Sequence, residues 1–134
     1  MIVKEIEKEQ ALYFINEHHF ELMCNKYWSK KYVYYGVFNN DELVAIQIVV
    51  PNFPGWSYEK GRIDGSCHLV VLQKTEGTAH GVFKTVLDYF SPLYKGKYIY
   101  LEVYVDKLRD MYEGLGFQKV FKNNPHMYKK YIED

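Results

Sequence analysis

The chain has 134 residues, of which 48% are hydrophobic and 18% aromatic, so we expect one domain, 1–134, around a single buried core. Seventeen basic residues balance seventeen acidic ones, and this neutral balance gives no electrostatic reason to expect a nucleic-acid or membrane partner. There is no apolar run of roughly eighteen residues and no secretory pattern, and the two cysteines suggest reduced thiols, so a cytoplasmic protein is expected.

The first half of the chain predicts a strand, a helix and a hairpin. Apolar residues recur at helical spacing before Met23, while the run from Tyr32 is aromatic and β-branched. Asn39-Asn40-Asp41 is a hairpin turn signal, and Pro51 is expected to end the returning strand. The expected elements are a strand over 1–4, a helix over 7–23, strands over 32–38 and 42–50, and an irregular loop or strand extension over 52–63.

The second half alternates strands with helices. Residues 97–105 alternate, with Ile99, Leu101 and Val103 on one face and tyrosines and Glu102 on the other. The expected elements are strands over 66–73 and 97–105, helices over 78–91 and 106–114, and a final strand pair over 117–121 and 126–132. The order β-α-β-β-β-α-β-α-β-β predicts an α/β fold, a mixed central sheet flanked by helices.

The segment that joins strand 66–73 to helix 78–91 is rich in small residues. Gly77, Ala79 and Gly81 leave the backbone free to approach a ligand. Free N–H groups and the dipole of the following helix favour an anion at such a place. No Gly-Lys-Ser/Thr follows, which excludes a Walker A loop, and the spacing does not match a dinucleotide fingerprint.

Two motifs resemble those of the GCN5-related N-acetyltransferases. Lys74, Gly77 and Ala79 fit the spacing of Gln/Arg-x-x-Gly-x-Gly/Ala, which resembles the coenzyme A pyrophosphate loop of that family. Residues 110–117, Asp-Met-Tyr-Glu-Gly-Leu-Gly-Phe, resemble the family's Leu-Tyr-Glu-Lys-Leu-Gly-Phe segment and follow in the expected order. The resemblance implies the acyl-CoA N-acyltransferase fold.

That resemblance implies acetyl-CoA in a cleft between two parallel strands that splay apart, 66–73 and 97–105. An amine of a small molecule or a protein would attack the thioester directly, and Tyr112 would donate the proton to the leaving thiolate. The implied cofactor-binding residues contact the pantetheine arm through the backbone or hold the pyrophosphate: Leu69, Val70, Val71, Leu72, Lys74, Gly77, Thr78, Ala79, His80 and Gly81.

The general base is not marked by the motifs. Glu102 lies in a row of tyrosines on the strand face expected to border the cleft, and is the candidate base, although a solvated carboxylate is the plainer interpretation. His68 on the neighbouring strand is a second candidate, and water is a third. His18 and His19 point about 100° apart on a helix and have no third ligand nearby, so no metal site is expected.

Two alternatives stay open beside acetyl transfer. Lys74, Val105 and Leu108 depart from the family pattern, which favours a binding or regulatory protein that keeps the fold without activity. Residues 14–20 loosely resemble a segment of phage-encoded, acetyltransferase-like DNA-modification proteins. Aromatic residues before and after the hairpin would line the acceptor side, fill the core or form a homodimer interface: Tyr27, Trp28, Tyr32, Tyr34, Tyr35, Phe53, Trp56 and Tyr58.

Overall fold

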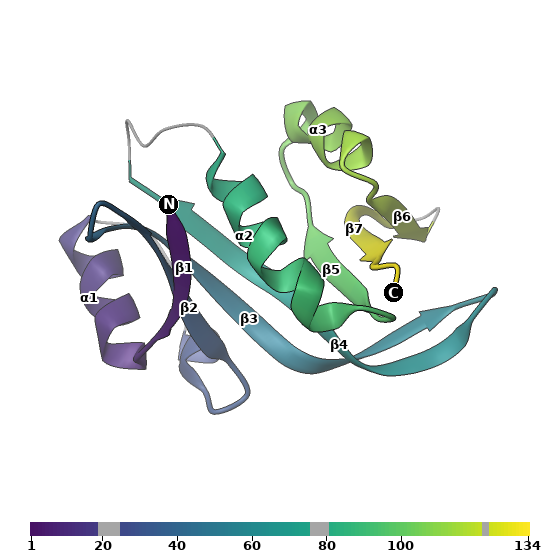
Figure 1. Cartoon of the computed structure of the whole chain (residues 1–134), viewed down its shortest axis with the longest axis horizontal. Coiled ribbons are helices and arrows are strands. Elements are labelled where there is room, and N and C mark those ends of the chain that lie inside the picture. Colours follow the sequence, from purple (N-terminus) through teal and green to yellow (C-terminus); the bar gives the residue numbers. More distant parts are fainter. Residues whose placement is uncertain (19–24, 76–80, 122–123) are drawn as a thin grey trace.

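The computed structural model describes residues 1–18, 25–75, 81–121 and 124–134 (Figure 1). The elements follow the expected order, with three short 3₁₀ turns added: β1 (Ile2–Ile6), α1 (Lys8–Glu17), η1 (Asn25–Trp28), β2 (Val33–Asn39), β3 (Glu42–Ser57), β4 (Gly61–Lys74), α2 (Val82–Phe90), η2 (Ser91–Tyr94), β5 (Tyr98–Glu102), η3 (Asp106–Leu108), α3 (Arg109–Gly114), β6 (Gln118–Phe121) and β7 (Asn124–Tyr131).

The strands form one seven-stranded sheet in the order β1-β2-β3-β4-β5-β7-β6. Every neighbouring pair is antiparallel except β4 and β5, which are parallel. A parallel pair needs a crossover connection, and α2 supplies it between β4 and β5. This mixed sheet confirms the predicted α/β fold.

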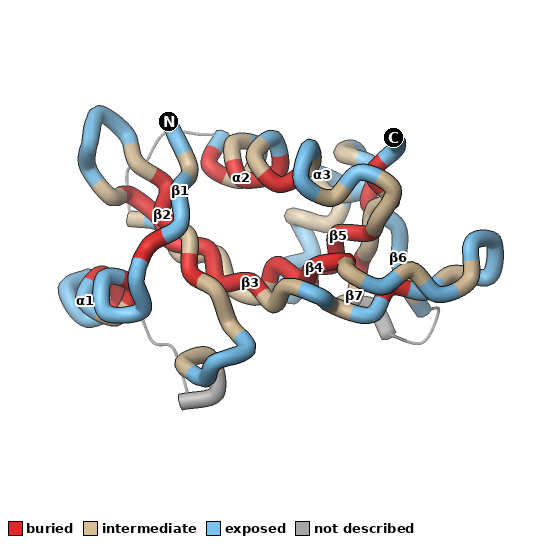
Figure 2. Tube along the Cα trace, turned by 60° about the horizontal axis from the view of Figure 1, so that its bottom comes forward, coloured by how far each residue is buried: buried red, intermediate tan, exposed pale blue. Residues whose placement is uncertain are grey.

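Helices cover both faces of the sheet. Helices α2 and α3 lie on one face, and α1 lies on the other (Figures 1 and 2). The larger core cluster packs under α2 and includes Val86, Phe90 and Leu69, while the smaller one packs Phe14 and Ile15 of α1 against β2 and β3. Each such buried side chain contributes roughly 1.5–3 kcal/mol of transfer free energy.

Helix α2 begins later than the sequence predicts. Gly81 has φ of 98°, a left-handed conformation that a helix cannot continue through, so the described helix begins at Val82 instead of 78. Its inner face is formed by Val82, Val86 and Phe90, all buried as predicted. The expected contribution of Ala79 to that face lies outside the described residues.

The expectation that Pro51 ends the returning strand is wrong. Strand β3 continues through Pro51 and Pro54 and pairs with β4 as a long hairpin, which is the strand-extension alternative for 52–63. Pairing of β3 with β2 ends at Val49, so beyond it β3 is an edge strand, where a missing N–H is tolerated. Register shifts around Phe53 and a φ of 55° at Asn52 bend this extension.

Strand β5 is buried on both faces of its alternating pattern. Tyr98, Ile99, Tyr100 and Leu101 are all buried. The β3–β4 hairpin covers the tyrosine face, since the Tyr100 hydroxyl accepts a hydrogen bond from the Trp56 N–H at 3.0 Å. Among the described helices none is long and apolar enough to cross a membrane.

Candidate functional site

The parallel strands β4 and β5 part in the middle of the sheet. They pair at Cys67↔Ile99, His68↔Tyr100 and Leu69↔Leu101, and no further. Beyond Leu69, β4 continues along β3 to Lys74, whereas β5 ends at Glu102. The predicted splay of the two strands therefore exists, and it opens directly after Leu69 and Leu101.

A β-bulge marks the point where the strands part. Ile48 pairs with Val71 and Val49 with Leu69, so Val70 is the extra residue of β4 and has no partner in the described pairings. A bulge bends its strand and leaves one residue outside the ladder. The bulge thus bends β4 where it leaves β5, with Val70 at the fork.

Gln47 supports the bulge from β3. Its side chain is 1% exposed, and its amide donates to the carbonyl oxygens of Val71 at 2.8 Å and Ile48 at 3.1 Å. A buried amide with such partners fixes the strand geometry, because leaving it unsatisfied costs about 1–3 kcal/mol. Sequence reasoning missed Gln47, although a single polar residue in the apolar run 44–50 was a usable signal.

On the α2 and α3 face, the fork encloses a hollow of about 140 Å³, here called the fork hollow. It is lined by Gln47, Leu69, Val70, Leu72, Phe83, Leu101, Glu102 and Tyr112. The Tyr112 ring meets the Phe83 ring edge-on at 4.9 Å and lies 6.1 Å from the Phe117 ring. Burial raises the pKa of Tyr112, so its phenol stays protonated at neutral pH.

On the α1 face, a second hollow of about 270 Å³ opens beside His68 and is here called the His68 hollow. It is lined by Tyr27, Lys31, Tyr32, Val50, Phe53, His68, Val70, Glu102 and Tyr104. Val70 and Glu102 line both hollows, so the two lie back to back across the fork. Each face of the sheet therefore has a hollow at the fork.

His68 and Glu102, the two candidate bases, are brought together in the His68 hollow. His68 is 8% exposed, and its Nε2 lies 3.7 Å from Glu102 Oε1 without a hydrogen-bond partner in the described structure. Burial lowers the pKa of His68, and the Glu102 charge opposes part of that shift. The other Glu102 oxygen accepts a hydrogen bond from the Tyr104 hydroxyl.

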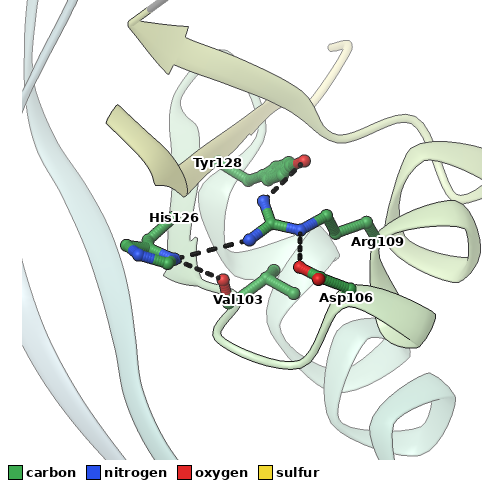
Figure 3. Close-up of polar contacts among 5 residues, drawn as sticks. All are labelled: Val103, Asp106, Arg109, His126 and Tyr128. Carbon is green, nitrogen blue, oxygen red and sulfur yellow. Dashed lines mark hydrogen bonds and ion pairs between the residues drawn. The ribbon is translucent and has the colours of Figure 1, made fainter. Parts of the chain in front are cut away.

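Helix α3, which carries Tyr112, is held on the sheet by Arg109 (Figure 3). The guanidinium forms an ion pair with Asp106 at 2.9 Å and reaches the hydroxyl of the fully buried Tyr128 at 3.5 Å. His126 Nδ1 lies 3.0 Å from the Val103 carbonyl oxygen and 3.5 Å from Arg109 Nη2. Because a carbonyl oxygen only accepts, Nδ1 carries the proton and donates to Val103.

The predicted cofactor-binding residues of β4 lie along the fork and beyond it. Leu69, Val70 and Leu72 line the fork hollow, while the Val71 carbonyl holds Gln47. Lys74 is exposed at the end of β4. Gly77, Thr78, Ala79 and His80 lie outside the described residues, and Gly81 is the N-cap of α2.

The first residue of the loop after β4 is still bonded to the sheet. The resemblance implies that N–H groups of residues 74–81 hold the pyrophosphate, and among these the Thr75 N–H donates to the Val44 carbonyl oxygen at 3.0 Å. That bond continues the β3–β4 ladder by one residue, so the loop begins later than expected. Helix α2 follows Gly81, which accepts hydrogen bonds from both the N–H and the hydroxyl of Thr85.

The aromatic residues expected on the acceptor side divide between core and surface. Tyr34 is buried and stacks on Trp28 at 5.4 Å, and Tyr35 packs edge-on against Phe90 of α2. Tyr27, Tyr32 and Phe53 line the His68 hollow, and Phe53, Trp56 and Tyr58 line a further hollow of about 280 Å³. In the described part of the chain, no group of three metal-ligating side chains comes together.

The sequence and the fold were compared with those of known proteins. No protein-family model and no curated protein matches the chain by sequence. Solved structures do match. The histone acetyltransferase HPA2 and related acetyltransferase from Corynebacterium glutamicum has a TM-score of 0.66 at 12% identity, covering 99% of this chain and 97% of that chain. An acetyltransferase from Thermus thermophilus has a TM-score of 0.66 at 15% identity, covering 96% and 95%.

A third match is AtaT complexed with acetyl-methionyl-tRNAfMet, with a TM-score of 0.63 at 16% identity, covering 94% of this chain and 92% of that chain. This chain has the fold of the GCN5-related N-acetyltransferases, as its motifs predicted. Other structures with this fold are complexes with acetyl-CoA or DNA. The expectation that nucleic acid is not a partner therefore gains no support from the fold.

Proposed function

We propose that this protein transfers an acetyl group from acetyl-CoA to an amine at the fork between β4 and β5. The observation that carries the proposal is the fork itself. It has a hollow on each face of the sheet, and both hollows are lined by Val70 and Glu102. Two reactants can therefore meet at one point from opposite faces. The acetyl-CoA complexes among structures of this fold support the choice of donor.

The size and lining of the fork hollow fit the thioester end of acetyl-CoA. The fork hollow, about 140 Å³, is smaller than the roughly 300–1,000 Å³ of pockets that bury a whole ligand, so it suits the narrow thioester end alone. The phosphates would lie outside it, near the N-terminus of α2, where unpaired N–H groups and the helix dipole favour an anion. Gly81 leaves open space there, since a Cβ at this residue would meet nothing within 4 Å.

The proposed loop contacts are those that the resemblance implies. The backbone of Leu69, Val70, Val71 and Leu72 would hold the pantetheine arm. The loop residues would surround the pyrophosphate: Lys74, Gly77, Thr78, Ala79, His80 and Gly81.

The side chains at the fork supply the proton transfers that the reaction needs. Bound acetyl-CoA supplies a thioester carbonyl carbon, to which the amine nitrogen bonds while the carbon–sulfur bond breaks. The backbone of Val70, which lines the fork hollow at the bulge, would lie beside the carbonyl oxygen and stabilise its negative charge through an N–H group. Tyr112 donates its phenolic proton to the leaving sulfur, and burial keeps that proton in place at neutral pH.

The proton lost by the amine goes to the Glu102–His68 pair. Burial favours the neutral imidazole, which is a proton acceptor, and the Glu102 carboxylate at 3.7 Å stabilises the imidazolium that forms. Glu102 therefore keeps its predicted role as part of the base, with His68 beside it.

The test is release of free coenzyme A thiol from acetyl-CoA with a panel of amines. Tyr112→Phe removes only the hydroxyl, and we expect kcat to fall about 100-fold or more, while acetyl-CoA affinity stays unchanged. Tyr89→Phe is the matched control, since Tyr89 is also partly buried and packs on a neighbouring aromatic ring, Phe90, but lines no part of the fork hollow. Equal turnover in Tyr112→Phe and wild type would end the assignment of Tyr112. Saturable binding of coenzyme A without turnover on any amine would favour a regulatory protein.

A further inference from the structure

The His68 hollow adjoins a second, more apolar hollow on the same face of β5. This aromatic hollow, about 280 Å³, is lined by Phe53, Pro54, Trp56, Ser57, Tyr58, Tyr100, Val120, Phe121, Met127 and Lys129. Phe53 lines both hollows, and its ring lies 5.2 Å from the His68 ring and 5.0 Å from the Tyr100 ring. A ligand that spans Phe53 would therefore occupy both hollows at once.

The His68 end of this paired site is built for an N–H donor. His68 Nε2 is buried and has no hydrogen-bond partner among the described residues, and Glu102 Oε1 lies 3.7 Å away. The second Glu102 oxygen is already used by Tyr104, which leaves Oε1 for a ligand. A primary amine can donate to Glu102 Oε1, which lies 3.7 Å from the buried Nε2. Lys31 and the Glu102 carboxylate both line this hollow, so charges of both signs face a ligand there.

The other end is built for one aromatic ring. Phe53, Tyr100 and Phe121 supply ring surfaces, and Trp56 is 48% exposed at the wall of the hollow. A cavity of about 150 Å³ holds benzene, so the aromatic hollow has room for one ring and a short linker. Lys129 closes one side, with its Nζ donating to the Trp56 carbonyl oxygen at 2.7 Å. This fixed cation repels a ligand that carries a second ammonium group there.

We infer that the acceptor is a primary monoamine that carries an aromatic ring, with its nitrogen at Glu102 beside His68 and its ring in the aromatic hollow. That this amine is acetylated rests on the proposed acetyl transfer. That it binds here rests on the two hollows alone. The site disfavours diamines and polyamines at its aromatic end, where the Lys129 ammonium group is held by the Trp56 carbonyl oxygen.

The test separates binding from turnover. Calorimetric titration of the protein without acetyl-CoA compares phenethylamine, n-butylamine and putrescine, and thiol release with acetyl-CoA then compares the same amines. We expect phenethylamine to bind at least tenfold more tightly than the others and to give the highest kcat/KM. Trp56→Ala should weaken phenethylamine at least tenfold. The Trp56 bonds to Tyr100 and Lys129 use its backbone and survive this change.

Tyr13→Ala is the matched control, because Tyr13 is 70% exposed and lines neither hollow. Tyr13→Ala should leave phenethylamine affinity unchanged. Phenethylamine binding that depends on Trp56, without any acetylation, would uphold the site and refute the acetyl transfer. Acetylation of putrescine, a peptide or an aminoacyl-tRNA in preference to phenethylamine, with Trp56→Ala unchanged, would refute the acceptor and leave acetyl transfer standing.

Discussion

Replacing Arg109 tests how α3 and its Tyr112 are held on the sheet. Arg109→Met keeps the apolar stem of the side chain and removes the guanidinium. The ion pair with Asp106 contributes at most about 0.5 kcal/mol, because the Asp106 side chain is 93% exposed and its charge is screened by water. The larger loss is at Tyr128, whose fully buried hydroxyl loses its Arg109 donor. At 3.5 Å that bond is long, so the expected cost is near the lower limit, about 1 kcal/mol.

The sum predicts a loss of about 1.5 kcal/mol in the free energy of unfolding, which for a chain of 134 residues lowers Tm by about 5 °C. Thermal and urea unfolding followed by circular dichroism measure it. Asp106→Asn is the matched control, since it removes the ion pair and leaves the bond to Tyr128, and it should lower Tm by less than about 2 °C. If Asp106→Asn and Arg109→Met destabilise the protein equally, the exposed ion pair holds α3 and the reasoning from buried groups is refuted.

Three further predictions concern packing and titration. Gly55→Ala places a Cβ 2.6 Å from Ser66 Oγ and 2.9 Å from the Ile63 carbonyl oxygen. We expect it to lower the free energy of unfolding, measured in urea, by about 2 kcal/mol. Gly114→Ala is the control and should not destabilise the protein, because there is open space around that residue. Equal effects of the two changes would show that the hairpin adapts. The pKa of His68 is lowered in the folded protein, so the unfolded chain protonates His68 at a higher pH than the folded protein does. The free energy of unfolding should therefore fall as the pH drops below about 6.5, the usual pKa of histidine. His68→Gln should flatten that slope in urea titrations between pH 7 and 5, and an unchanged slope would contradict the assignment. Burial raises the pKa of Cys67 to about 12, so its thiol should be unreactive in the folded protein. In a Cys24→Ser variant, we expect Cys67 to react with a disulfide reagent at pH 8 only when urea unfolds the protein. Reaction of the folded variant at the rate of a free thiol would contradict the burial of Cys67.

The order of elements could be predicted because each element carries a local signal. The helix face of α2 and the hairpin turn at Asn40 and Asp41 follow from spacing and turn residues, and both turn residues have the positive φ that such a turn needs. The limits of β3 and β5 depended on distant neighbours. Pro51 is tolerated because β2 has already ended, and Tyr100 is buried because the hairpin lies over it. Neither neighbour is visible in the local sequence.

The candidate site was also predictable only where a local signal marked its residues. Tyr112 was chosen from the second motif, Leu69 from the strand that the resemblance puts beside the cofactor, and Glu102 from its strand face. The bulge at Val70 and its support by Gln47 arise from the register of two strands, which local periodicity does not specify. The closeness of His68 and Glu102 follows from the parallel pairing of β4 with β5. That register brings the two candidate bases to one hollow.

The central claim is that the fork binds acetyl-CoA with its phosphates at the N-terminus of α2. Calorimetric titration with acetyl-CoA tests it on wild type, Gly81→Glu and Gly61→Glu. The two glycines are matched, since each has a positive φ and open space around its Cβ, so both glutamates bring similar strain. Only Gly81 lies beside the proposed phosphate site. We expect micromolar binding that is lost in Gly81→Glu and kept in Gly61→Glu. No binding to wild type, or equal binding to both variants, would contradict the proposed site.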